Sequence, residues 1–536
     1  MTRRRILSIV FLSIVLIPIT AILYHRFTAA ISSLGKSSIV HMANPSSPPV
    51  IVVGAGLAGL SATYSALQAG APAVRLLERA PKPGGNSIKA SSGINGAPTR
   101  YQNAAKYGVD QSFWDDTVRS AGTRLRAESV TEAVRSHRQS LISTLTGHSA
   151  AAIDFLVDLG VDLSVVAQLG GHSKPRTHRG AGKTPPGAAI VTTLLNKLKE
   201  QHANRFELLT GAEVTKLLTE AERVTGVEYR TATTDTETNA TTTTTHTLHG
   251  PVVFTTGGFG GDTHGLLAKY RPDLAGLPST NDPRPGAHTL LSAVGARLVD
   301  MESVQVHPTG FVDPANPSAR VKFLAAEMLR GEGAVLLYKG KRFVNELDTR
   351  ERVSEAVMKL LSVEEGGLRQ WDVQILLDPG ATEAAAGHVG FYLWKGLLQK
   401  KKVKELDETT RQTLLEYAAA VRGEVKDPFG RVAFGHWRLG TEEGSGIDED
   451  AEVCIGRVTP IVHFTMGGAV FNERAQVLAS EIGEEAKPIQ GLWAAGEITG
   501  GIHGDNRLGG SSLLECVVFG RIAGEQAAKA ALEGKA

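Results

Sequence analysis

The stretch that decides the fold is Val50-Ile51-Val52-Val53-Gly54-Ala55-Gly56-Leu57-Ala58-Gly59. Its β-branched start predicts a buried parallel strand, and the residues from Leu60 to Ala69 predict a helix that ends at Gly70. Val74-Arg75-Leu76-Leu77 predicts the second strand. In such a βαβ unit the first glycine makes the turn, the second lets the backbone approach a pyrophosphate, and the third allows close helix–strand packing. The pattern therefore predicts a Rossmann-like dinucleotide-binding domain.

The predicted nucleotide contacts follow from the physics of this unit. The start of the helix offers free N–H groups and a positive dipole end to phosphates, and an acid at the end of the second strand can bind ribose hydroxyls. That acid is Glu78, which comes 19 residues after the last glycine of the motif. The residues that we expect to contact the dinucleotide here are Gly54, Ala55, Gly56, Ala58, Gly59, Glu78 and Arg79.

Three later segments return to the same pocket and indicate which dinucleotide it holds. Small-residue loops cover positions 84–96, a strand runs into glycines over 251–260, and a third strand does so over 491–497. Several segments that converge on one cofactor suit a large ligand such as FAD better than NAD. The predicted contacts from these segments are Gly85, Asn86, Ser87, Ser92, Gly93, Gly257, Gly258 and Glu497.

The composition excludes several classes of protein. The 536 residues are 42% hydrophobic and 21% charged, which excludes a polytopic membrane protein and a disordered chain. A net charge of +2 gives no reason to expect a nucleic-acid partner. The two cysteines, Cys454 and Cys516, are too few for a disulfide scaffold or a four-cysteine metal site. Redox chemistry must therefore come from a bound organic cofactor, and we predict no metal site.

The amino terminus differs from the rest of the chain. Arg3, Arg4 and Arg5 precede an uncharged apolar run from Ile6 to Leu23, long enough to cross a membrane. We interpret residues 1–26 as a signal-anchor, with a cleaved signal or a mitochondrial presequence as alternatives, and residues 27–48 as a linker. This predicts membrane association at the endoplasmic reticulum, with the mitochondrion second. Asn239 begins a glycosylation sequon compatible with a lumenal body.

Four polar stretches in the second half of the chain are hard to explain as fold alone. They contain His307 before a proline, which places it in extended backbone, His463 beside glycines, Arg507 in a glycine-rich turn, and Arg350 among acids. A substrate with two carboxylates needs cations and N–H donors at both ends, and arginine offers a bidentate fork. Taken singly, each residue is more often structural: a lone histidine is usually a satisfied structural or surface residue, and a loop arginine is usually a salt-bridge partner.

With these motifs the chain resembles the FAD-dependent fumarate reductase and succinate dehydrogenase flavoproteins over about residues 48–534, closest to the soluble, fungal-like fumarate reductases. The resemblance assigns His307, His463 and Arg507 to the substrate carboxylates. It implies hydride transfer from the N5 atom of reduced FAD to fumarate, with Arg350 as proton donor and Glu327 and Arg330 as the pair that delivers protons to it.

The resemblance also implies the domain order. It predicts an α/β fold in which a Rossmann-like FAD-binding domain, residues 49–300 and 465–536, is interrupted by an inserted α+β capping domain at 301–464. We expect closure of the cap to assemble the site and exclude water. The last helix is predicted to begin near Ser511 with a capping box from Ser512 to Glu515, its N-terminus at the flavin pyrimidine edge. The expected flavin contacts on it are Ser511, Leu513 and Leu514.

Two departures from the family pattern matter. Membrane-bound respiratory members link the flavin to a histidine in the loop that corresponds to 84–96, and this loop contains none, so we expect FAD to be bound noncovalently. Bacterial soluble members have threonine where this chain has Ala326, which puts one substrate contact in doubt.

Other functions stay open at this point. The alternatives are a succinate dehydrogenase-like enzyme, an aspartate oxidase, a 3-ketosteroid dehydrogenase, or a membrane-tethered flavoprotein without catalysis. The sequence does not indicate the electron donor, and NADH, free reduced flavin or a redox protein could each serve.

Overall fold

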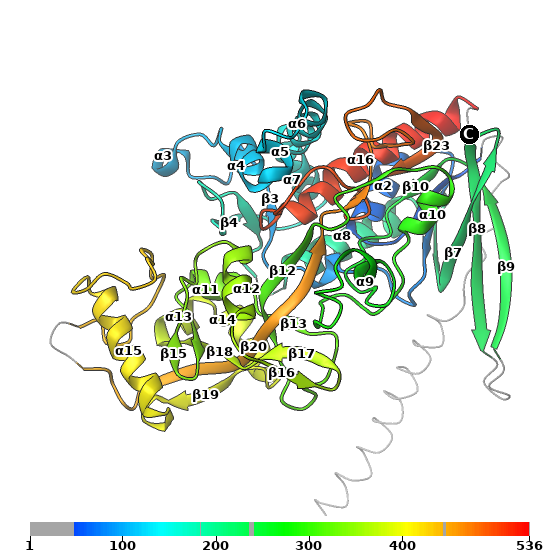
Figure 1. Cartoon of the computed structure of the whole chain (residues 1–536). Helices are drawn as coiled ribbons and strands as arrows, with labels where there is room; N and C mark the ends of the chain where they lie inside the picture. Colours follow the sequence, from blue (N-terminus) through cyan, green and yellow to red (C-terminus); the bar gives the residue numbers. More distant parts are fainter. Residues whose placement is uncertain (1–47, 183, 235–240, 443–445, 535–536) are drawn as a thin grey trace, which may run out of the picture. The chain divides into compact units, whose positions relative to one another are not determined.

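The computed structural model describes residues 48–182, 184–234, 241–442 and 446–534 (Figure 1). The predicted signal-anchor at 1–26, the linker up to residue 47 and the Asn239 sequon lie outside the described residues, so they stay predictions. Residues 46–536 form one compact unit. Within it the described chain builds two large sheets, and the site lies where segments from both meet.

The first sheet confirms the predicted dinucleotide-binding fold. Its strand order is β22-β23-β10-β1-β2-β6, and β1 (Val50–Val53) lies between two parallel neighbours, β10 (Val252–Phe254) and β2 (Val74–Glu78). The remaining members are β6 (Phe206–Thr210), β22 (Gln476–Leu478) and β23 (Pro488–Ala494). Because β10 also pairs in parallel with β23, two of the three segments that were expected to converge on one cofactor, 251–260 and 491–497, lie side by side.

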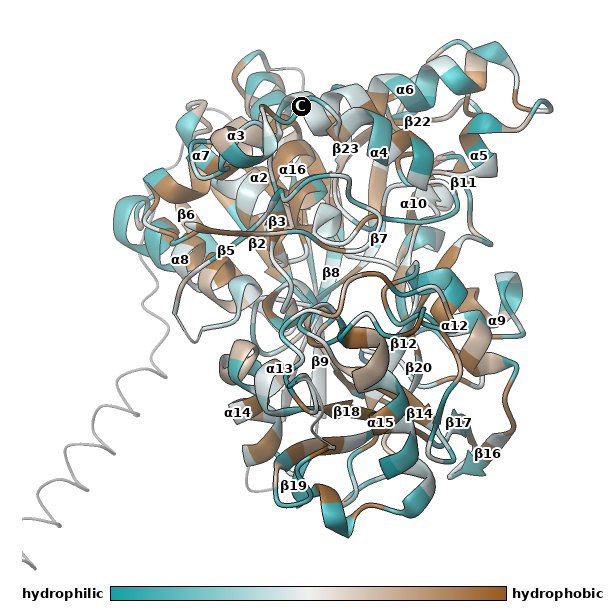
Figure 2. Ribbon diagram, turned by 90° about the vertical axis from the view of Figure 1, so that its left-hand side faces the viewer, coloured by the Kyte–Doolittle hydropathy of each residue, from teal (hydrophilic) through white to brown (hydrophobic). Residues whose placement is uncertain are grey.

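Two helices pack closely against this sheet. α2 (Leu57–Gln68) follows β1 directly, and α16 (Ser511–Leu532) lies against α2 (Figure 1). A Cβ atom at Gly524 of α16 would lie 2.1 Å from the carbonyl oxygen of Ala62 of α2, so only glycine permits this approach. In Figure 2 the hydrophobic segments run through the sheets and the packed helices, while hydrophilic segments mark the outer helices and loops.

The second sheet is built from residues between 304 and 465. Its order is β13-β12-β20-β18-β14-β15, with β19 (Gln399–Lys402) also paired to β20. β12 (Val304–Phe311) and β20 (Glu452–Thr465) are antiparallel neighbours, with Val306 opposite Val462. The remaining strands are β13 (Phe323–Leu324), β14 (Val335–Tyr338), β15 (Lys341–Arg342) and β18 (Val373–Leu377). This sheet occupies the region predicted as the cap, although the domain boundaries themselves remain predictions.

The threonine-rich stretches at 231–234 and 241–247 belong to two paired strands, β8 (Arg223–Thr234) and β9 (Thr241–His249). With β7 (Ala212–Glu220) these strands make a three-stranded antiparallel sheet that extends away from the body of this unit (Figure 1). Threonine is β-branched, and β-branched residues favour such extended pairing.

One helical stretch among the described residues, Glu132–Asp158, is long and apolar enough to cross a membrane by length and composition alone. It comprises α6 (Glu132–Gly147) and α7 (Ser149–Asp158), and both pack against α16. A buried core helix passes the same test, so this stretch gives only weak support for membrane association.

Candidate functional site

The turn between β1 and α2 has the geometry that a dinucleotide phosphate needs. Gly54 adopts a φ of 102°, and a Cβ atom at Gly59 would lie 1.9 Å from the Gly54 carbonyl oxygen, so both positions require glycine. Gly56, the residue before α2, has no side chain to cap that helix, although the Leu57 N–H donates to the Ser87 hydroxyl. A Cβ atom at Gly56 would meet only the Ser87 hydroxyl, at 3.6 Å. The helix therefore presents uncapped N–H groups beside open space, as anion binding requires.

The neighbouring predicted contacts gather around this turn. Glu78 accepts hydrogen bonds from the backbone N–H of Ala55, at 2.9 Å, and of Ala80, at 2.8 Å, so its carboxylate braces the glycine turn. Ser87 accepts one from the N–H of Leu57 at 3.2 Å. Arg79 lies further out, exposed, and donates to the Pro285 carbonyl at 3.0 Å.

The remaining predicted contacts lie on the loops that follow the strands. Asn86 bonds to Asn281. Gly93 and Gly257 have positive φ angles, and Gly85 does as well. A Cβ atom at Gly258 would lie 2.2 Å from a carboxylate oxygen of Glu497. Burial raises the pKa of Glu497 to about 7, because the lost hydration outweighs the hydrogen bonds from Thr465 and the charge of Arg507.

The last helix begins as predicted but lacks the predicted side-chain cap. α16 starts at Ser511 after Gly510, which is in the left-handed conformation, and no side chain caps it. The predicted capping box is wrong: Glu515 does not bond back to Ser512 but accepts from His503 Nε2 at 2.7 Å. A buried hydrogen-bonding partner outweighs the local capping pattern. Of the predicted flavin contacts, Ser511 is buried at the start of the helix, and Leu513 and Leu514 belong to the core.

Three of the six polar residues predicted for chemistry, Glu327, Arg350 and Arg507, line a small pocket where three parts of the chain meet. Gly170 and Gly171 come from the first segment; Glu327, Thr349 and Arg350 come from the second; Asn506, Arg507 and Gly509 come from the third. The predicted catalytic pair and the predicted substrate arginine are thus brought together, although they are up to 180 positions apart in the chain.

Gln305 of β12 joins the two arginines of this pocket. Its Oε1 accepts a hydrogen bond from Arg350 Nη1 at 3.1 Å and from Arg507 Nη2 at 3.0 Å. Its Nε2 donates to the Asn506 side chain at 2.8 Å and to the Arg507 carbonyl at 2.9 Å. The sequence reasoning missed Gln305 and Asn506, although Gln305 lies two positions before the predicted His307, on the same face of a strand.

Glu327 pairs directly with Arg350 and only loosely with Arg330. Arg350, the first residue of α12 (Arg350–Met358), donates to Glu327 Oε2 through Nε at 2.7 Å and also through Nη2. Arg330, in the short helix α11 (Met328–Gly331), has Nη2 3.9 Å from Glu327 Oε1 and donates through Nη1 to the Glu346 carbonyl. Burial alone would raise the pKa of Glu327, but Arg350 and Arg330 outweigh it and hold that pKa below its ordinary value.

The two predicted substrate histidines are adjacent and neutral. Their rings lie 5.5 Å apart, centre to centre, one on β12 and one on β20. His307 Nδ1 accepts from the Thr309 N–H at 3.2 Å, which leaves its proton on Nε2. Burial, assisted by nearby arginines, lowers the pKa of both His307 and His463 well below 6.5.

Several buried donors in this site have no hydrogen-bond partner among the described residues. They are His307 Nε2, Arg507 Nε, and Nε and Nη2 of Arg330; His463 Nδ1 is likewise unpaired. Burial lowers the pKa of Arg507 to about 9, so its guanidinium remains charged at neutral pH. Arg330, Arg350 and Arg507 with one carboxylate, Glu327, leave two positive charges. The site therefore has both the unpaired donors and the net charge that a dianion would satisfy.

The sequence of this chain is similar to those of known proteins over most of its length. Residues 49–513 match the family model described as "FAD binding domain". The chain is 39% identical over 511 residues to fumarate reductase of Schizosaccharomyces pombe, covering 92% of this chain and 91% of that protein. It is 40% identical over 501 residues to fumarate reductase 1 of Saccharomyces cerevisiae, covering 90% and 98%.

The chain belongs to the fumarate reductase and succinate dehydrogenase flavoprotein family. A solved structure, the open conformation of a flavocytochrome c3 fumarate reductase, superposes with a TM-score of 0.68 at 30% identity, covering 95% of this chain and 81% of that one. The protein is thus an FAD-dependent oxidoreductase, as the sequence predicted. The residues present fit FAD: an uncapped helix start, glycines that leave open space, and an acid at the end of β2.

Proposed function

We propose that this protein reduces fumarate to succinate. The observation that carries the proposal is the pocket around Arg350: two excess positive charges, unpaired buried donors, and a guanidinium–carboxylate pair at one wall. Fumarate has two carboxylates and two negative charges, so it matches this site in charge and in hydrogen-bonding needs. Relatives named fumarate reductase over nearly the whole chain support the same substrate.

In this proposal Arg507, His307 and His463 bind the substrate carboxylates. Arg507 is positioned by Gln305 and by the ring of Phe464, 4.3 Å from its guanidinium. The neutral histidines donate N–H groups without adding charge, which keeps the site at two positive charges. Such donors stabilise the extra negative charge that develops on the substrate in the transition state. Ala326 offers no hydroxyl; its N–H donates to Tyr392 at 3.1 Å, so the charged groups carry the binding.

Reduced FAD, when bound, supplies a hydride to one alkene carbon. Arg350 gives a proton to the other carbon, which becomes strongly basic as the hydride arrives, and this basicity makes an arginine acid tolerable. Arg350 then regains a proton through its direct hydrogen bonds with Glu327, whose ionised carboxylate first accepts that proton from Arg330, next in line behind it. Burial of all three groups keeps bulk water from protonating the substrate at random.

The proposal extends to the setting of the enzyme. The proposal includes noncovalently bound FAD and a membrane anchor at residues 1–26. It places the rest of the protein at the endoplasmic reticulum, with the mitochondrion as the alternative. The electron donor is open among NADH, reduced free flavin and a redox protein.

The deciding experiment is reduction of fumarate by the FAD-loaded protein with reduced methyl viologen as electron donor. Oxidation of viologen should require fumarate. One succinate should form for each pair of electrons that the viologen gives up. FAD-loaded protein that leaves fumarate unchanged under these conditions would overturn the proposal. The rate with fumarate is compared with the rates with acrylate and with a 3-ketosteroid, because neither of these has two carboxylates to match the charge of the pocket.

A further inference from the structure

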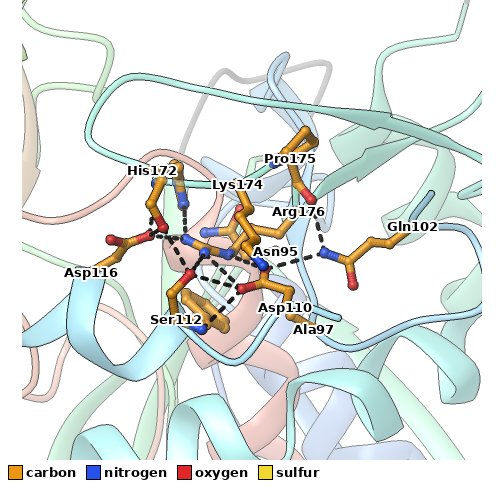
Figure 3. A network of polar contacts seen from close by, with 12 residues as sticks. Asn95, Ala97, Gln102, Asp110, Ser112, Asp116, His172, Lys174, Pro175 and Arg176 are labelled. Carbon is orange, nitrogen blue, oxygen red and sulfur yellow. Dashed lines mark hydrogen bonds and ion pairs between the residues drawn. The ribbon is translucent and has the colours of Figure 1, made fainter. Parts of the chain in front are cut away.

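A buried polar cluster beside the pocket has no role in the proposed reaction. At its centre Arg176, which is fully buried, uses all five of its N–H groups (Figure 3). Two go to Asp110, at 2.7 and 3.0 Å, and one to Ser112 at 3.1 Å. The remaining two go to Asp116, at 2.5 Å, and to His172 Nδ1, at 2.9 Å. A guanidinium with every donor satisfied is a rigid anchor for whatever its acceptors hold.

This anchor fixes the protonation of His172. A guanidinium can only donate, so His172 Nδ1 must be the acceptor. Its Nε2 lies 2.9 Å from the carbonyl oxygen of Gly509, which can only accept, so Nε2 carries the proton and donates. His172 is therefore neutral and held as a single tautomer. Burial and the charge of Arg176 lower its pKa to about 4, in agreement with this geometry.

His172 thereby holds the peptide that precedes α16. The Gly509 carbonyl accepts a second hydrogen bond, from Asn95 Nδ2 at 2.8 Å, and Thr177 in turn fixes Asn95 by donating to its Oδ1 at 2.7 Å. In a trans peptide the C=O and the following N–H point in opposite directions. Two donors on the Gly509 carbonyl therefore fix the direction of the Gly510 N–H, which donates to no group in the part of the chain that the structure describes.

The free Gly510 N–H lies at the start of α16, where the flavin pyrimidine edge is expected. We propose that His172 is a positioning residue that aims the Gly510 N–H at the flavin and so helps to stabilise its reduced form. A fixed N–H donor stabilises negative charge without reorganising, and hydrogen bonds at the opposite, carbonyl end of the same peptide strengthen it as a donor. This inference rests on the proposed function in one respect, the position of the flavin.

The test compares His172→Gln with His172→Met. The two side chains have nearly the same length, but only glutamine keeps an N–H that can reach the Gly509 carbonyl. The measurement is the midpoint potential of bound FAD, obtained by equilibrating the FAD-loaded protein with a reference dye. His148→Met, at an exposed histidine between α6 and α7, controls for the chemistry of the substitution.

We expect His172→Gln to keep the wild-type potential. His172→Met should lower it by about 30 mV, which for a two-electron couple is a tenfold loss of stabilisation of reduced over oxidised flavin. The kcat for viologen-driven fumarate reduction should not fall, because a less stabilised reduced flavin is a stronger hydride donor, and KM should change less than twofold, because no substrate contact is removed. Equal potentials in wild type and His172→Met would overturn the proposal. So would failure of both variants to fold and bind FAD, since His172 would then serve the fold alone.

This outcome is separate from that of the proposed function. The potential is measured without fumarate, so a wild-type protein that binds FAD but does not reduce fumarate still yields a result for His172. Conversely, fumarate reduction by the wild type with no shift in His172→Met leaves the proposed function standing.

Discussion

One carboxylate oxygen of Glu327, Oε2, accepts hydrogen bonds from both Nε and Nη2 of Arg350. The two residues are 23 positions apart, and both side chains are almost fully buried. The second oxygen of Glu327 faces Arg330 at 3.9 Å. Glu327 thus lies between two guanidinium groups, one at the pocket and one behind it, which is the order that proton delivery to the substrate would need.

Replacing the proposed proton donor should reduce turnover without removing FAD. We expect Arg350→Gln to lower kcat by about 10²–10⁴-fold, the usual contribution of a positioned general acid. The measurement is viologen-driven fumarate reduction, with the FAD content determined from the flavin absorbance. Arg352→Gln is the matched control, because Arg352 lies on the same helix with its side chain 72% exposed. A rate for Arg350→Gln equal to that of the control would remove Arg350 from the reaction.

Neutralising the acid between the two arginines tests proton return separately from substrate binding. Glu327→Gln keeps the shape of the side chain but cannot carry a proton to Arg350, so kcat should fall by at least about 10²-fold. KM for fumarate should rise far less, because Glu327 contacts Arg350 rather than the proposed clamp. Glu355→Gln on the exposed face of α12 provides the comparison. A variant that changes KM alone would place Glu327 in binding instead.

The protonation of the two histidines leads to a prediction for pH. Because burial lowers the pKa of His307 and His463 well below 6.5, both are already neutral at pH 6 and do not titrate above it. The KM for fumarate should therefore stay within about twofold between pH 6 and pH 8. Steady-state kinetics over this range checks the prediction. A tenfold rise in KM per pH unit above 6.5 would show instead that a protonated histidine binds the substrate.

The buried acid at Glu497 should make the FAD-free protein less stable as pH rises. Its pKa is about 7 in the folded state and 4.5 as its ordinary value, so the folded protein binds the proton more tightly. The stability that this proton contributes is fully present below pH 4.5 and is lost as pH rises to about 7. Glu497→Gln removes this dependence, so its Tm relative to wild type should be higher at pH 8 than at pH 5. Thermal unfolding of both FAD-free proteins measures the difference, and a constant offset at both pH values would contradict it.

The FAD should dissociate intact from the denatured protein. The loop at 84–96 contains no histidine that could link the flavin, and the nearby histidines are engaged: His178 Nε2 with Thr99, and His388 Nε2 with the Ser91 carbonyl. After acid precipitation, the yellow colour should remain in the supernatant and elute as free FAD. Flavin that stays with the precipitated protein would instead show a covalent bond.

The local sequence pattern was sufficient for the dinucleotide-binding unit. The β-branched run at Val50–Val53, the glycines after it and Glu78 each act within about 30 residues, and the structure has β1, α2 and β2 in their expected places. Steric demands explain this success, because Gly54 and Gly59 occupy positions where any Cβ atom would collide with the backbone. Such constraints are visible in a single sequence.

Only the tertiary structure decided which polar groups meet. Gln305 bonds to Arg350, 45 positions away, and to Arg507, 202 positions away. His172 bonds to Gly509, 337 positions away. The periodicity of a sequence does not predict such pairings. The same is true of Glu515, whose capping pattern predicts a bond to the helix start but which pairs with His503 instead. Sequence by itself determined the cofactor fold and the residue types that dicarboxylate chemistry needs. The folded chain decided their protonation and partners, because burial and neighbouring charges arise only when distant segments pack together.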